Sequence, residues 1–482
     1  MLIYITAVFF SQYFWLFLLI FVDFDAILQT KEVNPLNNYR DDNYITLDNC
    51  MILTVNESND FIENGRIIIR GHIIESIGTQ ADLESKGHLY DMHGRIIMPG
   101  LINTHTHSPS TLFRGLADDK FLQEWLNEYM WPAEKHLTDE LTYLGSRLGY
   151  LEYLSNGMTT NVDMWYFADA ISRAAEESGL RSVIASGTFA FPTPQSANSL
   201  QDTADYLENF EKRKGNSPHL QRIIPCVGPH DVYSTNPALL KECVQLSKKY
   251  DTMIHMHLSE TQLDNEHALN LYNMTPTQVV ENAGIFERKT LFAHCIYLSD
   301  NDMDIFKKYN ASISYNPVTN LKLCEGILPI SKLREKGINV SIGVDGAQSN
   351  NSLDLLSDTK TGVLIQKVND MNPCTLNAVD AIRMITINGA KAIGLDNVIG
   401  SLEPGKYADL ISFDIDIPSM TPILNKTLEN ISSHIIYTDT TINDVMVNGE
   451  FLLKDKTYCK LDVSSILKDA QEAADYITKK LK

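Results

Sequence analysis

Apolar strand candidates alternate with helical stretches from Pro99 to about residue 395, and this rhythm limits the possible folds more than any other feature of the chain. Eight βα repeats are typical of a closed (β/α)8 barrel, whose active site lies at the C-terminal ends of the strands. An open, doubly wound sheet is the alternative, but no GxGxxG motif follows any of the strands. The eight candidates are the strand entering His105 and the segments 158–164, 181–186, 222–228, 252–258, 290–295, 312–316 and 340–345.

One helical stretch shows the expected start and stop signals. Thr138 can cap the helix, and Asp139 and Glu140 follow in the first turn, where the helix dipole favours acids. Gly157 ends the stretch. Leucines recur between these ends at helical spacing, at positions 141, 144, 148 and 151.

Short alternating segments before and after the barrel region predict a second unit. Residues 44–98 have the period-two pattern of an antiparallel β unit, and similar short strands return in residues 399–456. We therefore expect a composite β-sandwich built from both ends of the chain, flanking a barrel formed by residues 99–398. Residues 457–482 are expected to close the chain with an amphipathic helix.

The first residues differ from the rest of the chain. Residues 2–22 have no charged side chain and are long enough to span a bilayer, but no basic region precedes them as in a signal peptide. The segment 1–24 is thus either a membrane anchor or an extension that the working protein lacks, and 25–43 has the polar composition of a linker. We expect a cytoplasmic protein, with membrane anchoring through residues 2–22 as the alternative.

Charge and cysteine content exclude several classes of protein. The net charge is 40 − 61 = −21, which argues against a nucleic-acid partner. An apolar content of 44% excludes a disordered chain. The seven cysteines form no CxxC pair, which argues against both a disulfide framework and a cysteine zinc site.

Histidines and an aspartate stand at the ends of the predicted barrel strands. His105 and His107 are two residues apart, so both imidazoles can point to one side of a strand and reach one metal ion. A lone HxH pair is equally compatible with a structural role. However, His257, His294 and Asp345 end other strands, and polar side chains in such places are costly unless they converge on a site.

A carboxylate follows one of these strands. Glu260 comes three residues after His257, where it can exchange protons with a water activated by the metal, although a surface or capping role is the simpler alternative. His255 is interpreted as a core residue behind the ligands. The strand ending in Pro229–His230 carries no lysine to bridge two metals, so we expect one divalent ion, zinc or else iron.

The ordered segments PGLINTHTH, GMTTNVDMW, HMHLSET, AHC, YNPVTNLKLCEGILPI and IGVDGAQSNNSLD resemble the amidohydrolase superfamily. Within it, the chain is most similar to methylthioadenosine/S-adenosylhomocysteine deaminases, over about residues 44–460. The resemblance implies a metal-dependent hydrolase that converts adenosine-type nucleosides to inosine-type products and ammonia.

The same resemblance implies a role for each site residue. His105, His107, His257 and Asp345 would hold the metal, usually zinc. His294 would polarise the attacking oxygen, Glu260 would carry a proton from water to ring N1, and Asp345 would also accept a proton from the attacking water. The family's ribose-binding glutamate corresponds to Glu134, and its substrate-binding histidine corresponds to His230.

One departure from the family concerns the pocket for the 5′ group of the nucleoside. Members that use S-adenosylhomocysteine are expected to pair its carboxylate with arginines after the third strand. Ser186 stands at the first such position, and no arginine occurs between Arg181 and Arg213. We therefore expect a preference for a short or apolar 5′ group, unless another lysine, arginine or subunit supplies the charge.

Two other readings remain open. A guanine deaminase or a triazine chlorohydrolase would share the metal ligands, and only Glu134 and His230 favour a nucleoside. A catalytically inactive scaffold of the same fold typically lacks ligands, whereas this chain has them all. A homo-oligomer is compatible with the sequence, and the only partner expected otherwise is the small-molecule substrate.

Overall fold

A computed structural model describes residues 43–214 and 219–481, and the described residues from Tyr44 onward form one compact unit. The predicted hydrophobic segment 2–22 lies outside the described residues, as does the predicted linker apart from Asn43. Within the described ranges, no helix is long and apolar enough to cross a membrane.

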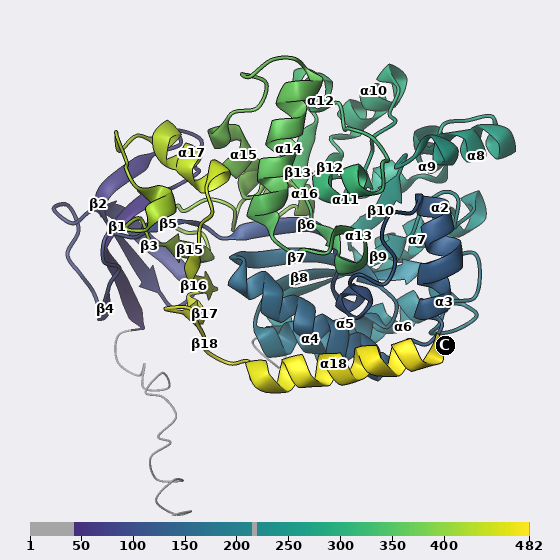
Figure 1. Cartoon of the computed structure of the whole chain (residues 1–482), viewed down its shortest axis with the longest axis horizontal. Helices are drawn as coiled ribbons and strands as arrows, with labels where there is room; N and C mark the ends of the chain where they lie inside the picture. The colour runs from purple at the N-terminus through teal and green to yellow at the C-terminus, as the bar shows by residue number, and fades with distance from the viewer. Residues whose placement is uncertain (1–42, 215–218, 482) are drawn as a thin grey trace, which may run out of the picture. The chain divides into compact units, whose positions relative to one another are not determined.

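The centre of this unit is a parallel sheet that closes into the predicted (β/α)8 barrel (Figure 1). Each strand pairs in parallel with the next, and a final two-residue strand returns to pair with the first. Its strands are β6 (Leu101–His107), β7 (Met158–Trp165), β8 (Arg181–Thr188), β9 (Ile223–Pro229), β10 (Ile254–Leu258), β11 (Thr290–His294), β12 (Ser312–Tyr315), β13 (Asn339–Ile342) and β14 (Asp345–Gly346).

The predicted eighth strand, 340–345, is interrupted where the barrel closes. β13 ends at Ile342 and β14 begins at Asp345. Gly343 lies between them, and a Cβ there would come within 2.7 Å of the backbone nitrogen of His105 and 2.6 Å of Asn316 Oδ1. The close approach requires glycine, and the break lets Asp345 pair with Thr106 at the end of the first strand.

Helices follow the strands in sequence and cover the barrel (Figure 1). The longer ones are α4 (Asp139–Ser155), α5 (Ala168–Ser178), α6 (Ser199–Arg213), α7 (Pro237–Tyr250), α8 (Gln262–Tyr272), α9 (Pro276–Ala283), α10 (Asp300–Tyr309) and α14 (Leu355–Asn369). The shorter ones are α2 (Leu122–Glu124), α3 (Trp131–Glu134), α11 (Pro317–Lys322), α12 (Ile330–Glu335), α13 (Ala347–Asn350), α15 (Ala378–Met384) and α16 (Ile387–Ile393). The ten-residue helix α17 (Leu428–Tyr437) comes later in the chain.

The start signals read for α4 are confirmed, but its most buried face differs from the leucine stripe. The side chain of Thr138 accepts a hydrogen bond from the Leu141 N–H, and the helix ends at Ser155. The small residues Gly145 and Gly149 lie on its buried face, against the 3-10 turn Ser108–Phe113 that follows β6. The leucines at 141, 144 and 148 are only half-buried.

A second sheet joins both ends of the chain, as the sequence predicts (Figure 1). The junction is the antiparallel pairing of β5 with β15, in which Ile97 faces Ser412. Side chains alternate across β5: Ile97 packs inside this sheet, whereas Ile96 and Met98 pack toward the barrel core. Its strands are β1 (Tyr44–Leu53), β2 (Phe61–Arg70), β3 (Ile73–Thr79), β4 (His88–Asp91), β5 (Ile96–Pro99), β15 (Leu410–Phe413), β16 (Ile442–Val447), β17 (Glu450–Lys454) and β18 (Thr457–Tyr458).

Two expectations about this unit need correction. The 44–98 part is a mixed rather than an antiparallel sheet, because the chain crosses back after β3 and runs beside β1 in the same direction through β4 and β5. Residues 457–458 belong to the sheet as β18, since Tyr458 pairs with Leu453. The C-terminal helix α18 (Val463–Lys480) therefore begins later than residue 457. It lies along α4, where Asp469 pairs with Arg147 at 3.3 Å (Figure 1).

Candidate active site

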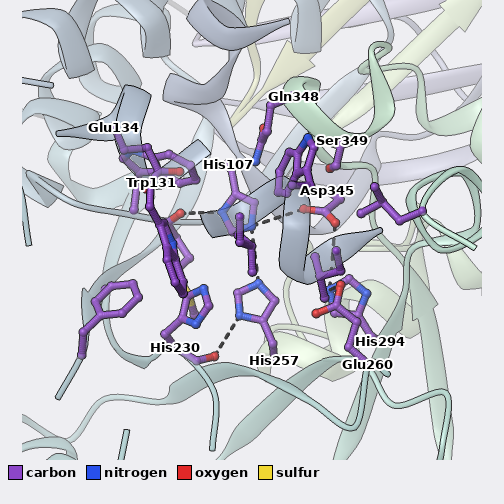
Figure 2. Close-up of a pocket in the computed structure, with 18 of the residues that line it drawn as sticks. His107, Trp131, Glu134, His230, His257, Glu260, His294, Asp345, Gln348 and Ser349 are labelled. Carbon is purple, nitrogen blue, oxygen red and sulfur yellow. Dashed lines mark hydrogen bonds and ion pairs between the residues drawn. The ribbon is translucent and has the colours of Figure 1, made fainter. Parts of the chain in front are cut away.

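The four predicted metal ligands converge toward the C-terminal ends of barrel strands. Figure 2 shows three of them, His107, His257 and Asp345. Asp345 Oδ1 lies 3.2 Å from His107 Nε2 and 3.5 Å from His105 Nε2. His257 Nε2 lies 3.4 Å from His107 Nε2. These separations match those between neighbouring ligand atoms around one ion with bonds of about 2.1 Å.

Backbone carbonyls fix the tautomer of two of these imidazoles. His107 Nδ1 lies 2.7 Å from the carbonyl oxygen of Met164, and His257 Nδ1 lies 2.8 Å from that of His230. A carbonyl oxygen only accepts, so each Nδ1 carries the hydrogen and donates it. Each Nε2 is left with a free lone pair that points into the site.

A third imidazole is oriented through another histidine. His255 Nδ1 donates to the carbonyl of Leu291 over 3.0 Å, so its Nε2 is an acceptor. That atom lies 2.8 Å from His105 Nδ1, which must therefore donate. His105 Nε2 is buried and has no hydrogen-bond partner, although it faces the other ligands. The sequence placed His255 behind the ligands, and the structure confirms this position.

This arrangement fits a divalent cation. Three imidazole lone pairs and a carboxylate oxygen would repel one another without a positive charge among them. Burial lowers the pKa of His257 to about 4 and that of His105 well below its usual value, so both rings are neutral and able to coordinate at neutral pH. Imidazole and carboxylate ligands suit zinc or iron.

The backbone is strained where the strands end at this site. His294 has φ = 69° and Asp345 has φ = 62°, and Ser259, directly before Glu260, has φ = 48°. Non-glycine residues with positive φ are uncommon and cost free energy, and they cluster at functional sites. These positions follow β10, end β11 and begin β14, next to the side chains of the proposed site.

Glu260 and His294 lie together beside the proposed ligands (Figure 2). His294 Nε2 is 3.4 Å from Glu260 Oε1 and 4.0 Å from Asp345 Oδ2. The amide of Asn320 donates to His294 Nδ1 over 2.8 Å, so the ring hydrogen is on Nε2 and points toward these carboxylates. His294 thus offers a hydrogen-bond donor to an atom bound at the site.

The pocket in front of these residues has a volume of about 640 Å³, its open mouth included. Glu134 and His230 line its opposite side, as Figure 2 shows. Glu134 accepts a hydrogen bond from Tyr166, and burial raises its pKa to about 7. The ring of His230 stacks on Phe189 at 4.6 Å. All the predicted site residues except His105, which is fully buried, line this one pocket.

Several pocket residues were not foreseen. A helical segment with a π-turn at Trp125–Met130 brings aromatic and aliphatic side chains over the pocket, and such turns are frequent at functional sites. Asn320 and Glu325 do not line the pocket but lie behind it, beside His294, in a segment that the resemblance quotes without giving either a role. Other unforeseen lining residues are Leu122, Trp125, Leu126, Trp131, Trp165, Tyr166, Phe189, Tyr233 and Gln348.

The expectation that Ser186 of β8 belongs to the pocket for the 5′ group needs correction. Ser186 is buried, and Thr203 of α6 donates to its hydroxyl over 3.0 Å, so this side chain lies on the outer face of the barrel. The next residue, Gly187, lines the pocket instead, because neighbouring strand residues point to opposite faces. The pocket lining contains neither lysine nor arginine.

Comparisons with known proteins agree with this geometry. The chain is 36% identical to a 5-methylthioadenosine/S-adenosylhomocysteine deaminase of Syntrophomonas wolfei, over 89% of this chain and 98% of the relative. It is 38% identical to a 5'-deoxyadenosine deaminase of Methanobrevibacter smithii, over 90% and 98%. A crystal structure of an adenosine deaminase from Xanthomonas campestris with bound zinc superposes with a TM-score of 0.85 at 26% identity, covering 90% of this chain and 98% of that one.

The family model agrees with these relatives. The amidohydrolase family model matches residues 96–452, which include the whole barrel, the strands β15 and β16 and the first part of β17. The chain is therefore an enzyme that hydrolyses carbon–nitrogen bonds, and it belongs to the amidohydrolase family.

Proposed function

We propose that the protein deaminates adenosine-type nucleosides by hydrolysis, releasing ammonia and an inosine-type product. The observation that carries this proposal is one pocket with a buried carboxylate at each side: Glu260 beside the proposed ligands and Glu134 opposite them. The first suits proton transfer at the purine ring, and the second suits binding of ribose hydroxyls. The relatives named as deaminases of adenosine-type nucleosides support the same substrate class.

The proposed ligands His105, His107, His257 and Asp345 would hold one divalent ion, zinc or iron. Such an ion lowers the pKa of water and neutralises negative charge that develops during attack. The protein's part begins with Glu260, whose carboxylate accepts a proton from the attacking water and returns it to ring N1. The Nε2–H of His294 donates to the oxygen that attacks C6, and Asp345 accepts the second proton.

The reaction is balanced without a redox partner. Water adds its oxygen to C6 of the purine, and the C6–N6 bond breaks. One proton of the water remains on N1 of the product, and the other joins the departing amino group, which leaves as ammonia. The aromatic wall formed by Trp125, Trp131 and Phe189 restricts water around the base and sugar. The carboxylate of Glu134 accepts hydrogen bonds from the ribose, and His230 contacts the purine.

Within this substrate class, we propose a preference for a short or apolar 5′ group. A zwitterionic homocysteine tail would leave its carboxylate without a cationic partner, because the lining includes no lysine or arginine. The aromatic and aliphatic side chains of the pocket favour a hydrogen, hydroxyl or methylthio group in the same place.

The experiment is ammonia release by the metal-loaded protein given adenosine, 5′-deoxyadenosine, methylthioadenosine, S-adenosylhomocysteine, guanine or a chlorinated triazine. We expect release from the first three, lost in Glu260→Gln. Efficient use of S-adenosylhomocysteine would overturn the 5′ preference alone. Activity confined to guanine or the triazine would overturn the nucleoside assignment.

A further inference from the structure

A second glutamate lies directly behind the proposed proton shuttle. Glu325 follows α11 in the loop before α12 and is only 4% exposed. One side-chain atom each of Glu260, His294 and Glu325 lies within 4.8 Å of the others. Glu325 is not among the residues that line the pocket, so it does not meet the substrate itself.

Asn320 connects this glutamate to His294. The Asn320 amide nitrogen donates to Glu325 Oε2 and to His294 Nδ1, each over 2.8 Å. Both hydrogens of the amide are thereby used, which fixes the orientation of the amide and of the imidazole together. The other oxygen of Glu325, Oε1, is buried and has no donor within reach among the described residues.

The carboxyl groups of Glu325 and Glu260 lie close together, with one oxygen of each within 4.8 Å of the other. Two buried carboxylates side by side repel each other unless they share a proton. Burial raises the pKa of Glu325 to about 8. The pair therefore holds a proton at neutral pH. Because the proposed reaction starts with Glu260 ionised, that proton belongs on Glu325.

We propose that Glu325 is a positioning residue, which donates a hydrogen bond from Oε1 to the carboxylate of Glu260 and, through Asn320, ties Glu260 to His294. This inference rests on the proposed function, since it assigns Glu260 as the proton carrier. Held by one oxygen, Glu260 keeps its other oxygen toward the site, in a fixed orientation relative to the His294 donor.

The loop that carries Glu325 is held in place by several contacts. The Glu325 N–H donates to the carbonyl of Asn320 over 2.8 Å, and the Tyr297 hydroxyl donates to the Glu325 carbonyl. Gly326 has φ = 136°, a conformation that disfavours other residues, and a Cβ there would lie 2.9 Å from Ile296 Cγ2. These constraints fix the position of the Glu325 backbone and therefore limit the positions that its carboxyl group can reach.

Two near-isosteric variants separate hydrogen bonding from packing. Glu325→Gln keeps a donor for Glu260 and an acceptor for Asn320, whereas Glu325→Met fills the same space with neither. We expect kcat of Glu325→Gln within about threefold of wild type. We expect kcat of Glu325→Met to fall by at least about tenfold, part of the 10²–10⁴ that acid–base catalysis contributes, with KM for methylthioadenosine nearly unchanged.

Equal kcat for wild type and Glu325→Met would overturn the inference and leave the deaminase intact. A wild-type protein that releases no ammonia from any nucleoside would overturn the proposed function, and the inference with it. A fall in kcat that is the same in both variants would also overturn it, since Glu325→Gln retains the donor.

A second readout does not depend on activity. Infrared difference spectra between wild type and Glu325→Gln at pH 7 are expected to contain the carbonyl stretch of one protonated carboxylic acid, with no matching carboxylate band. A carboxylate band in its place would show that Glu325 is ionised and would overturn the inference. Metal analysis completes the test. A second divalent ion per chain in the wild type that is lost in both variants would mean that Glu260, His294 and Glu325 bind a cation, and it would overturn the inference.

Discussion

The Tyr166 hydroxyl donates to Oε2 of Glu134 over 3.0 Å, so the proposed ribose-binding carboxylate is held by a neighbour from another part of the barrel. Burial raises the pKa of Glu134 to about 7, and the hydrogen bond from Tyr166 partly offsets this rise. Ribose hydroxyls donate best to the ionised form. We therefore expect kcat/KM for methylthioadenosine to increase as pH rises through about 7.

Variants at this pair give opposite tests of that expectation. Tyr166→Phe removes a donor that favours the carboxylate, so the pKa of Glu134 rises further and the increase in kcat/KM moves to higher pH. Glu134→Gln is expected to abolish this pH step and to raise KM at least tenfold, with a smaller effect on kcat. With 2′,3′-dideoxyadenosine the step is expected to be absent. If the pH step in kcat/KM persisted with 2′,3′-dideoxyadenosine, the titrating group would be one other than Glu134.

Metal binding and proton transfer are expected to separate in two variants. Asp345→Asn weakens the ligand set and is expected to lower both metal content and activity. Glu260→Gln leaves the four proposed ligands intact, so it is expected to retain one divalent ion while kcat falls by about 10²–10⁴. Elemental analysis of both purified variants beside ammonia release checks this. Loss of the metal from Glu260→Gln would contradict the role given to Glu260.

The sequence could place the proposed ligands together because they lie at or near strand ends, while their roles stay predictions. His105 and His107 lie in the last three residues of β6, His257 lies one residue before the end of β10, and Asp345 follows the end of β13. Parallel strands in a closed barrel end at the same rim. Period-two patterning likewise predicted the composite sheet. In both cases the position of a residue along its strand decides where its side chain lies in the folded protein, so the sequence pattern is sufficient for the prediction.

Other features depend on contacts that spacing does not encode. Glu325 lies in a loop, and only the positive φ of Gly326 and the fold of the preceding helix bring it behind Glu260. Ser186 was read as a pocket position because its motif aligns there, but strand alternation turns its side chain toward α6. The parallel pairing of β5 with β1 depends on a crossover, which strand patterns alone do not reveal.

The orientation of His105 by His255 gives a prediction about metal affinity. His255→Leu removes the acceptor for His105 Nδ1, which leaves that ring free to turn or change tautomer. Removing such a supporting hydrogen bond typically weakens metal binding by about 10–100-fold. Competition with a chelator measures the affinity, and thermal unfolding of the metal-free protein serves as the control for packing. Unchanged affinity in a folded variant would contradict the relay.

A buried ion pair links the barrel to the composite sheet. Arg181, at the start of β8, donates from Nε and Nη2 to Asp409 Oδ2 at 3.1 and 3.0 Å, and both side chains are about 95% buried or more. Asp409→Ala leaves the guanidinium without its charged partner, so we expect a loss of about 3–5 kcal/mol in the free energy of unfolding. Arg181→Met with Asp409→Leu removes both charges and is expected to cost less. Denaturant titration of the three proteins decides between these outcomes.

Because the pocket lining has no lysine or arginine, we expect that a positive side chain placed at the edge of the pocket would change the substrate preference. Phe191 is 37% exposed and its ring packs 5.6 Å from Trp131 and 5.2 Å from Phe189, both of which line the pocket. Phe191→Arg offers a guanidinium to the carboxylate of a homocysteine tail. We expect kcat/KM for S-adenosylhomocysteine relative to methylthioadenosine to increase about tenfold, equivalent to ~1.4 kcal/mol. The gain should shrink at high salt, because the new pair is solvent-exposed. Phe191→Met is neutral and of similar size, so it should leave this ratio of kcat/KM values unchanged. An equal gain in Phe191→Met would contradict the prediction, because it would mean that the Phe191 ring obstructs the homocysteine tail and that the added positive charge has no effect.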